Sequence, residues 1–202
     1  KYIEPDTSSG EVRCDTGIVE GSEISIYYDP LICKLSTHGR NRQEALEKMK
    51  DALDSYVIKG LTHNIPLLRE VISHPKFVTG EISTKFLAEE FHHGFDGHQL
   101  SIEEDYALKA VAAYIHRYFQ GEMFEGRPAV GLNKFYVKVE QDFSSVCFAT
   151  GIKVDDKLVN FELLNWSPET SLLSCKVNGK QYIVQVVNRM GLGFELRMMG
   201  TV

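Results

Sequence analysis

The glycine-rich segment near the middle of the chain holds the most obvious candidates for metal chemistry, which are His92, His93, Asp96 and His98. Zinc sites hold their ligands at characteristic spacings and orient them with a rigid surrounding shell. Here two histidines are adjacent, so their side chains diverge, and the glycines around them give no rigid support. We therefore expect no metal site in this chain.

The four cysteines are the next group with possible chemistry. Cys14, Cys33, Cys147 and Cys175 show no CxxC spacing, and each lies in a strand-like apolar pattern. That pattern is typical of buried thiols, which behave as small apolar side chains. We expect reduced cysteines and a reducing compartment rather than disulfides or a metal cluster.

The stretch from Tyr27 to Tyr56 is the element around which the first half is organised. Leu31, Cys33 and Leu35 alternate with Ile32, Lys34 and Ser36, which predicts a strand. Asn41 followed by Glu44 is a capping box that begins a helix. Apolar residues at helical spacing follow until Gly60, namely Ala45, Leu46, Met49, Ala52, Leu53 and Tyr56.

Three sequence words in this region are specific enough to suggest a family. They are Tyr27-Tyr-Asp-Pro-Leu-Ile-Cys-Lys-Leu35, Gly39-x-x-Arg42 and Gly60-Leu-Thr-His-Asn-Ile-Pro-Leu-Leu-Arg69. These words resemble the C-terminal part of the biotin carboxylase domain of biotin-dependent carboxylases. Within that family they are most similar to propionyl-CoA carboxylase alpha chains, and the resemblance covers residues 1 to about 91.

The segment Val12-Arg13-Cys14-Asp15-Thr16 is similar to the family motif Val-Arg-x-Asp/Glu-Ser/Thr. The resemblance implies that Arg13 lies in the biotin site as a catalytic and cofactor-binding residue. Its guanidinium would stabilise the negative charge that develops on the ureido oxygen when N1 is deprotonated. Without the resemblance, Arg13 is most simply a solvated side chain. This chain also departs from the family by placing Glu11 directly before the motif.

Composition excludes two classes of partner. The chain carries 22 Lys+Arg against 28 Asp+Glu, a net charge of −6, with no basic stripe interleaved with aromatics. Its longest apolar runs are far shorter than the ~20 residues of a membrane span. We therefore expect neither nucleic acid nor a membrane as partner. The chain starts without Met and in mid-loop, which suggests an excised fragment of a longer protein.

The rest of the first half predicts a compact α+β unit. Strands are expected at residues 11–15, 22–28 and 31–37, forming a small antiparallel sheet. Helices are expected at residues 42–58, at 65–73 behind Asn64 and at 84–90, with Pro75 closing the second helix.

The second half predicts one long helix wrapped by an antiparallel β meander or partial barrel. Ser101 and Glu104 form a capping box, and apolar residues then keep helical spacing to about Gln120. Short strands follow, with Asn178-Gly179 as the strongest hairpin signal. Tyr114, Tyr118, Met123 and Phe124 widen the apolar surface of the helix beyond one face, which suggests an additional partner.

Family resemblance continues less sharply through this half. The resemblance rests on three segments, Gly80-Glu-Ile-Ser-Thr-Lys-Phe-Leu87, Gly94-Phe-Asp-Gly-His98 and the terminal Gly200-Thr-Val202. It implies that residues 1–92 end a biotin carboxylase domain. It also implies that residues 93–202 are a truncated linking domain, which docks the carboxyltransferase beta subunit.

The resemblance implies the activity of a ligase. The parent enzyme would carboxylate biotin with ATP, Mg²⁺ and bicarbonate, then transfer the carboxyl group to propionyl-CoA to give methylmalonyl-CoA. The fragment alone should be inactive, because it lacks the ATP-grasp and carrier parts. Lys48-Met49-Lys50 is similar to a biotin acceptor, but it lies within a helix pattern, so no covalently bound biotin is expected.

Two alternatives remain open at this point. One is another acyl-CoA carboxylase that acts on methylcrotonyl-CoA or acetyl-CoA, and the other is a non-catalytic docking module. Implied partners are the beta subunit, the biotin carrier domain of the same chain and other alpha chains. The implied location is the mitochondrial matrix, or the cytoplasm if the protein is bacterial.

Overall fold

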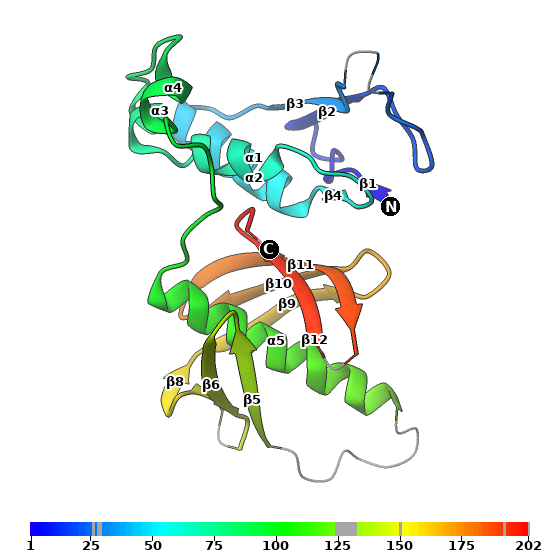
Figure 1. Cartoon of the computed structure of the whole chain (residues 1–202), viewed down its shortest axis with the longest axis vertical. Coiled ribbons are helices and arrows are strands. Elements are labelled where there is room, and N and C mark those ends of the chain that lie inside the picture. The colour runs from blue at the N-terminus through cyan, green and yellow to red at the C-terminus, as the bar shows by residue number, and fades with distance from the viewer. Residues whose placement is uncertain (26, 28–29, 124–132, 150, 192, 202) are drawn as a thin grey trace. The chain divides into compact units, whose positions relative to one another are not determined.

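The computed structural model describes the chain apart from residues 26, 28–29, 124–132, 150, 192 and 202 (Figure 1). The chain divides into two compact units, Lys1–His98 with Met199–Thr201 and Gln99–Met198. The predicted α+β class is confirmed, because helices accompany antiparallel sheets throughout. The functional division into residues 1–92 and 93–202 stays a prediction.

The first unit combines short strands with four helices among its described residues. The strands are β1 (Tyr2–Ile3), β2 (Val12–Thr16), β3 (Cys33–Thr37) and β4 (Val57–Ile58), and the helices are α1 (Arg42–Ser55), α2 (Ile65–Val71), α3 (Pro75–Thr79) and α4 (Phe86–Glu90). β1 pairs with β4 and β2 with β3, both antiparallel. A core of buried apolar side chains joins these elements, namely Leu46, Leu53, Tyr56, Ile58, Ile65 and Ile72.

Helix α1 begins as its sequence predicts. The backbone N–H of Glu44 donates to Asn41 Oδ1 over 2.9 Å. The Glu44 carboxylate completes the cap one residue earlier than expected, because it accepts from the backbone N–H of Arg40 over 3.0 Å. Two backbone groups at the helix start are thus satisfied by side chains.

Four expectations for the first unit are wrong. The described residues between 22 and 27 form no strand, so β2 pairs directly with β3. Val57 and Ile58 leave the predicted helix to pair with β1, a two-residue match too short to recognise in sequence. Pro75 begins the additional helix α3 instead of closing α2. The side chain of Asn64 makes no capping bond, and His63 Nδ1 accepts from the N–H of Ile65 instead.

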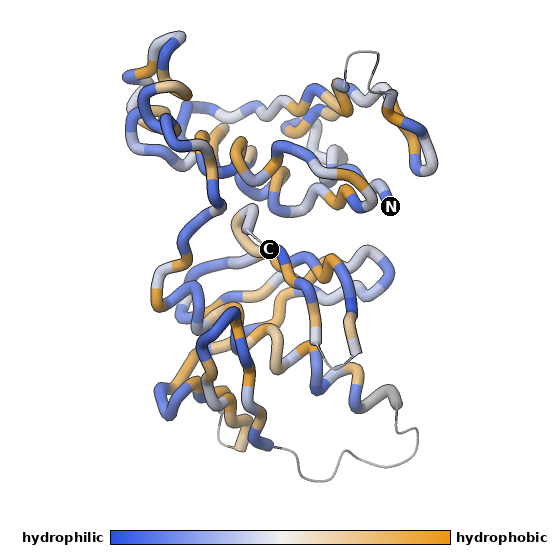
Figure 2. Tube along the Cα trace, in the orientation of Figure 1, coloured by the Kyte–Doolittle hydropathy of each residue, from blue (hydrophilic) through white to orange (hydrophobic). Residues whose placement is uncertain are grey.

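The second unit consists of one long helix and two four-stranded antiparallel sheets. These are α5 (Ile102–Met123), the sheet of β5 (Lys134–Val139), β6 (Asp142–Cys147), β7 (Ile152–Val154) and β8 (Lys157–Val159), and the sheet of β9 (Phe161–Ser167), β10 (Leu172–Val177), β11 (Lys180–Met190) and β12 (Gly193–Met198). Apolar and polar residues alternate along much of this trace in Figure 2. Each sheet is an open meander in the part of the chain that is described.

The hairpin turns follow the predicted chemistry. Asn178 and Gly179 both have positive φ, 51° and 84°, as a tight hairpin turn requires. Asn178 has a second role, because its Oδ1 accepts from the N–H of Asn160 over 2.9 Å. That bond lies between β8 and β9.

Helix α5 is buried on more than one side. The predicted capping box is present, since Ser101 N–H donates to Glu104 Oε2 over 2.9 Å and Glu104 N–H donates to Ser101 Oγ over 3.3 Å. Lys180 pairs with the other Glu104 oxygen over 2.7 Å. The fully buried residues Ala107, Ala110, Val111, Ala113 and Ile115 then spread around the helix. Among the described residues, no helix is long and apolar enough to cross a membrane.

The broad apolar surface of α5 is partly used within the unit. The ring of Tyr114 lies 5.3 Å from that of Phe161 in β9, and the ring of Tyr118 lies 5.7 Å from that of Trp166. Other residues of α5 contact β5 to β8. A helix packed against two sheets needs two apolar faces. Part of this apolar surface is therefore used within the unit. Phe124 lies outside the described residues, and the additional partner stays a prediction.

A buried lysine fixes α5 to the first of these sheets. The side chain of Lys109 is 0% exposed, and its ammonium pairs with Asp105 over 2.7 Å and with Asp142 in β6. Burial alone would lower the pKa of Lys109, but the two carboxylates outweigh it and raise this pKa above its ordinary value. The lysine therefore stays charged inside the unit.

We expect removal of the lysine to lower the free energy of unfolding less than removal of its two carboxylate partners. Lys109→Met keeps the apolar stem and leaves carboxylates that water can reach, since Asp142 is 73% exposed. The free energy of unfolding should change by about 1 kcal/mol or less. Asp105→Asn with Asp142→Asn leaves a buried, unpaired ammonium and should cost about 3 kcal/mol. Urea unfolding followed by the fluorescence of Trp166, the single tryptophan, measures both. A greater loss for Lys109→Met would contradict this account.

Candidate functional site

Hairpin β2–β3 presents three charged side chains on one face. Arg13 and Asp15 alternate with the half-buried Val12 and Cys14 along β2. Arg13 lies opposite Ser36 and Asp15 lies opposite Lys34 in the register. Successive strand residues point to opposite faces, so these charges share the outer face of the hairpin.

Arg13 is exposed but not free. Its Nε donates to Asp15 Oδ1 over 2.8 Å, while 76% of its side-chain surface remains exposed. The hydrogen bond and the charge of Asp15 raise the pKa of the Arg13 guanidinium. Within the described part of the chain, the other guanidinium nitrogens have no hydrogen-bond partner. Asp15 thus orients the group and leaves donors for a ligand.

The inner face of the hairpin packs on a polar cluster around Tyr56. The Tyr56 and Tyr2 hydroxyls are hydrogen-bonded to each other, and Tyr2 also bonds Thr16 Oγ1 over 2.8 Å. Cys14 Sγ donates to the Tyr56 hydroxyl over 3.5 Å and lies 3.0 Å from Cys33 Sγ. Burial of Tyr56, with these hydrogen bonds, raises its pKa. The cluster fixes β2 against the end of α1.

Lys48 connects the base of the hairpin to α1. Its ammonium pairs with Glu11, just before β2, over 2.7 Å and with Glu44 over 2.9 Å. The hydrogen bond from Lys48 is the first cause that lowers the pKa of Glu44, to about 2. Thr37 Oγ1 also donates to the carbonyl of Ala45 over 2.9 Å. Lys48 therefore has a structural role within a helix, and Met49 packs on the core.

Two other residues of the family motifs, Arg42 and Asp29, are not placed on the outer face of the hairpin. Arg42 donates to the carbonyl oxygens of Phe77 and Val78, the latter over 3.2 Å, and covers the ring of Phe77 at 5.0 Å. It therefore holds α3 against the start of α1. Asp29 lies outside the described residues.

The segment of His92 to His98 makes protein contacts. His98 Nδ1 lies 3.0 Å from Glu70 Oε2, and the backbone of His98 is bonded twice by Thr201 Oγ1, over 2.7 and 3.0 Å. The two family words that contain His98 and Thr201 are thus in direct contact within the first unit. No group of three or more potential metal ligands occurs among the described residues.

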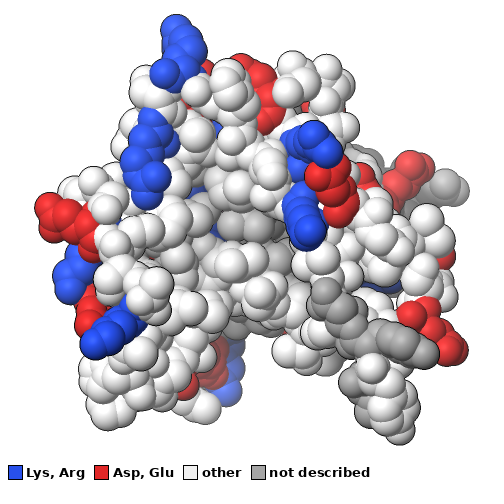
Figure 3. Space-filling model, turned by 90° about the horizontal axis from the view of Figure 1, so that it is seen from above, with Lys and Arg blue, Asp and Glu red and all other residues white. Residues whose placement is uncertain are grey.

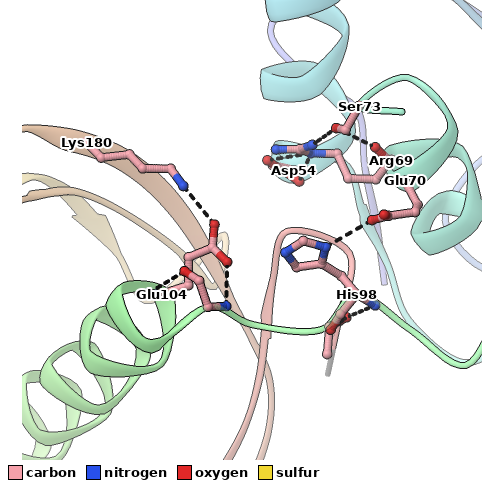
Figure 4. A network of polar contacts seen from close by, with 9 residues as sticks. Asp54, Arg69, Glu70, Ser73, His98, Glu104 and Lys180 are labelled. Carbon is pink, nitrogen blue, oxygen red and sulfur yellow. Dashed lines mark hydrogen bonds and ion pairs between the residues drawn. The ribbon is translucent and has the colours of Figure 1, made fainter. Parts of the chain in front are cut away.

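A buried ion pair between Asp54 and Arg69 joins α1 to α2 (Figure 4). Arg69 Nε lies 3.0 Å from both oxygens of Asp54, and Arg69 Nη1 donates to Ser73 Oγ over 2.6 Å. Burial raises the pKa of Asp54 to about 6, and the charge and hydrogen bonds of Arg69 limit that rise. Such pairs are costly to break from one side, so Arg69 is a structural residue.

The second unit has an exposed aromatic face and an open edge. Tyr136 in β5 and Phe143 in β6 are 74% and 66% exposed. Lys134 and Lys138 lie over these rings at 5.5 and 5.3 Å. Among the described residues, β5 and β12 are the terminal strands of their sheets, and both line a trough of about 640 Å³ whose other wall is α5. Unpaired strand edges and exposed aromatics are typical of contact surfaces.

Charged side chains of both signs are scattered over the face of the molecule drawn in Figure 3. In the face drawn in Figure 3, Lys and Arg side chains alternate with Asp and Glu, without a continuous basic patch. The chemistry available to the hairpin is therefore local. An oriented guanidinium beside one carboxylate can stabilise negative charge on a neutral or weakly acidic ligand.

Sequence reasoning missed how Arg13 is surrounded. Asp15 was part of the recognised motif, but its bond to Arg13 depends on both side chains leaving the same face. Lys34 belongs to the same face only because β2 pairs directly with β3. The alternation of residues along β2 could have predicted the contact between Arg13 and Asp15, because residues two apart in a strand share a face.

Comparisons with known proteins cover both units. Residues 1–89 match the family model described as Biotin carboxylase C-terminal domain. Residues 108–202 match the model described as Propionyl-coenzyme A carboxylase BT domain.

The curated relatives are longer proteins. The mitochondrial propionyl-CoA carboxylase alpha chain of Mus musculus is 42% identical over an alignment that covers 100% of this chain and 30% of that protein. The propionyl-CoA carboxylase alpha chain of Ruegeria pomeroyi is 36% identical, covering 96% and 30%. The mitochondrial methylcrotonoyl-CoA carboxylase subunit alpha of Dictyostelium discoideum is 41% identical, covering 43% and 12%. The chain thus spans less than a third of these proteins.

Gly39 is needed for the contact between the hairpin and α1. A Cβ atom added there would lie 2.5 Å from the backbone nitrogen of Ala45. We expect Gly39→Ala to destabilise the first unit by about 1–3 kcal/mol, because backbone must move. Hydrogen exchange of α1, followed by mass spectrometry, measures the loss. Gly17→Ala is the matched control, since nothing lies within 4 Å of its added Cβ. Equal effects of the two changes would refute the close-contact explanation.

Proposed function

The chain belongs to the family of biotin-dependent carboxylase alpha chains, and we propose that it supplies two parts of such an enzyme. The first unit would complete a biotin carboxylase domain, and the second would dock the carboxyltransferase beta subunit. The observation that carries this proposal is the order of the two matched domains along one chain, together with relatives aligned over its whole length.

The proposed parent enzyme is a ligase that acts on propionyl-CoA. It would use ATP, Mg²⁺ and bicarbonate to carboxylate biotin and would form methylmalonyl-CoA. Relatives with the propionyl-CoA name align over 96–100% of the chain, whereas the methylcrotonoyl-CoA relative covers 43% of it. This difference favours propionyl-CoA over methylcrotonyl-CoA. The short span relative to those proteins supports the expectation that this segment alone is inactive.

We propose the location and further contacts from the family resemblance. A eukaryotic parent would work in the mitochondrial matrix, as the name of the mouse relative suggests, and a bacterial parent in the cytoplasm. The first unit would also meet the biotin carrier domain of its own chain and other alpha chains.

Arg13 is the proposed catalytic residue of the first unit. Biotin, when bound, supplies the ureido nitrogen that accepts the carboxyl group. The fit to this group rests on the free donors of Arg13 and on the exposure of its side chain. Asp15 holds Nε, so the guanidinium is oriented before a ligand arrives. Its charge would stabilise negative charge on the ureido oxygen in the transition state.

We expect Arg13→Ala in the intact parent to lower the turnover of biotin carboxylation by about 10²–10³-fold, as for loss of an oxyanion-hole donor. The melting temperature should stay unchanged, because the side chain is largely exposed. Bicarbonate-dependent ATP hydrolysis with free biotin measures turnover. Arg40→Ala is the matched control, since Arg40 is also exposed and also pairs with one carboxylate. Wild-type turnover in Arg13→Ala would remove Arg13 from the site.

For the second unit, we propose that the beta subunit covers the exposed face of β5 and β6. Aromatic rings with lysines above them offer both apolar area and charge to a partner. The adjacent edge of β5 offers backbone groups that native proteins normally cover. The match to a propionyl-CoA carboxylase domain indicates which partner to test.

In the intact parent, Tyr136→Ser with Phe143→Ser should raise the Kd for the beta subunit by about tenfold or more. Sedimentation velocity of mixed subunits gives this constant. Leu87→Ser in the first unit is the control, because Leu87 is also exposed, at 53%. If both variants bind like the wild type, this face is not the docking surface.

A further inference from the structure

Cys14 and Cys33 form a pair that the function proposed above does not use. Cys14 lies opposite Leu35 and Cys33 lies opposite Thr16, so the two cysteines are diagonal neighbours across β2 and β3. Their Sγ atoms are 3.0 Å apart. A disulfide holds its sulfurs about 2.05 Å apart, so these would have to approach by about 1 Å, and the strands would have to shift to suit the diagonal position of the two residues.

The surroundings allow this pair to react. Both cysteines are half-buried, as Cys147 is, so a small oxidant can reach them, whereas Cys175 is fully buried. The feature that sets the pair apart is the contact between its two sulfurs. The Tyr56 hydroxyl accepts a hydrogen bond from the Cys14 thiol and can hold it during a reaction. Burial raises the pKa of Cys14 to about 12. Because the Cys14 thiol is already held by its hydrogen bond to Tyr56, we assign the first reaction with the oxidant to Cys33.

We propose that Cys14 and Cys33 form a reversible disulfide when the protein encounters hydrogen peroxide. The Cys33 sulfur attacks one peroxide oxygen, the O–O bond breaks and one water leaves, so Cys33 becomes a sulfenic acid. The Cys14 sulfur then attacks the Cys33 sulfur, the S–O bond breaks and a second water leaves. Two thiols lose two electrons and two protons, and peroxide is reduced to two waters.

The disulfide would cross-link the hairpin that carries Arg13. Cys14 directly follows Arg13 in β2, and the bond would join β2 to β3 on the face opposite the guanidinium. A cross-link restricts separation of the strands, so amide hydrogen exchange in β2 and β3 should slow by about tenfold or more. Bond formation does not depend on the proposed function. The two proposals therefore fail separately.

Mass spectrometry of the whole chain tests the bond directly. Trypsin cuts after Arg13 and Lys34, so one peptide, residues 14–34, contains both cysteines. After treatment with limiting peroxide, unfolding and alkylation, this peptide should carry no label and be lighter by two hydrogen atoms than the reduced, unlabelled peptide. Dithiothreitol should restore both labels, and Cys147 and Cys175 should remain labelled throughout.

Two variants make the test specific. In Cys14→Ser, a sulfenic acid on Cys33 should persist and be trapped by dimedone, and in Cys33→Ser no bond should form. The proposal is overturned if both cysteines of the wild-type peptide keep their label, if they pass to sulfinic acids without bonding, or if Cys147 or Cys175 reacts first. The wild-type result decides the matter even if a variant fails to fold.

Discussion

The position of the candidate site depends on the packing of a two-stranded hairpin against one helix. A hairpin of this size has little stability of its own in water. β2–β3 is held by contacts with α1, namely the Tyr56 cluster at one end and Lys48 with Thr37 at the other. The cap at Asn41 fixes where α1 begins, and Gly39 allows the backbone to pass close to it. The position of Arg13 therefore depends on helix α1, because α1 holds the hairpin that carries it.

Local chemistry made part of this structure predictable from sequence. The caps at Asn41 and Ser101 and the turn at Asn178-Gly179 satisfy backbone groups within a few residues, so short words suffice to recognise them. Pairing between distant segments was not predictable in the same way. β1 and β4 are two residues each, and their pairing joins Tyr2 to Ile58. Local pattern alone also predicted a strand at residues 22–28, which the described residues do not form, because β2 pairs with β3 instead.

The second unit shows that an apolar pattern does not identify what covers it. The wide apolar surface of α5 suggested an external partner, and internal packing on both sheets of the unit accounts for part of that surface. The buried Lys109 agrees with this arrangement, because a charge inside a unit requires partners, and Asp142 of β6 is one of them. Candidate contact surfaces are instead on the outside, at Tyr136 and Phe143, where strand alternation puts large rings on the solvent face.

One alternation explains both the predictable and the unpredictable parts of the site. Along β2, side chains alternate between solvent and the core, so Arg13 and Asp15 meet on one face while Cys14 meets Cys33 and Tyr56 on the other. The motif identified Arg13 through family resemblance, but the sulfur pair required the register of β3. Since both faces share one short strand, a disulfide on the inner face would act on the backbone that carries Arg13 without touching its charge.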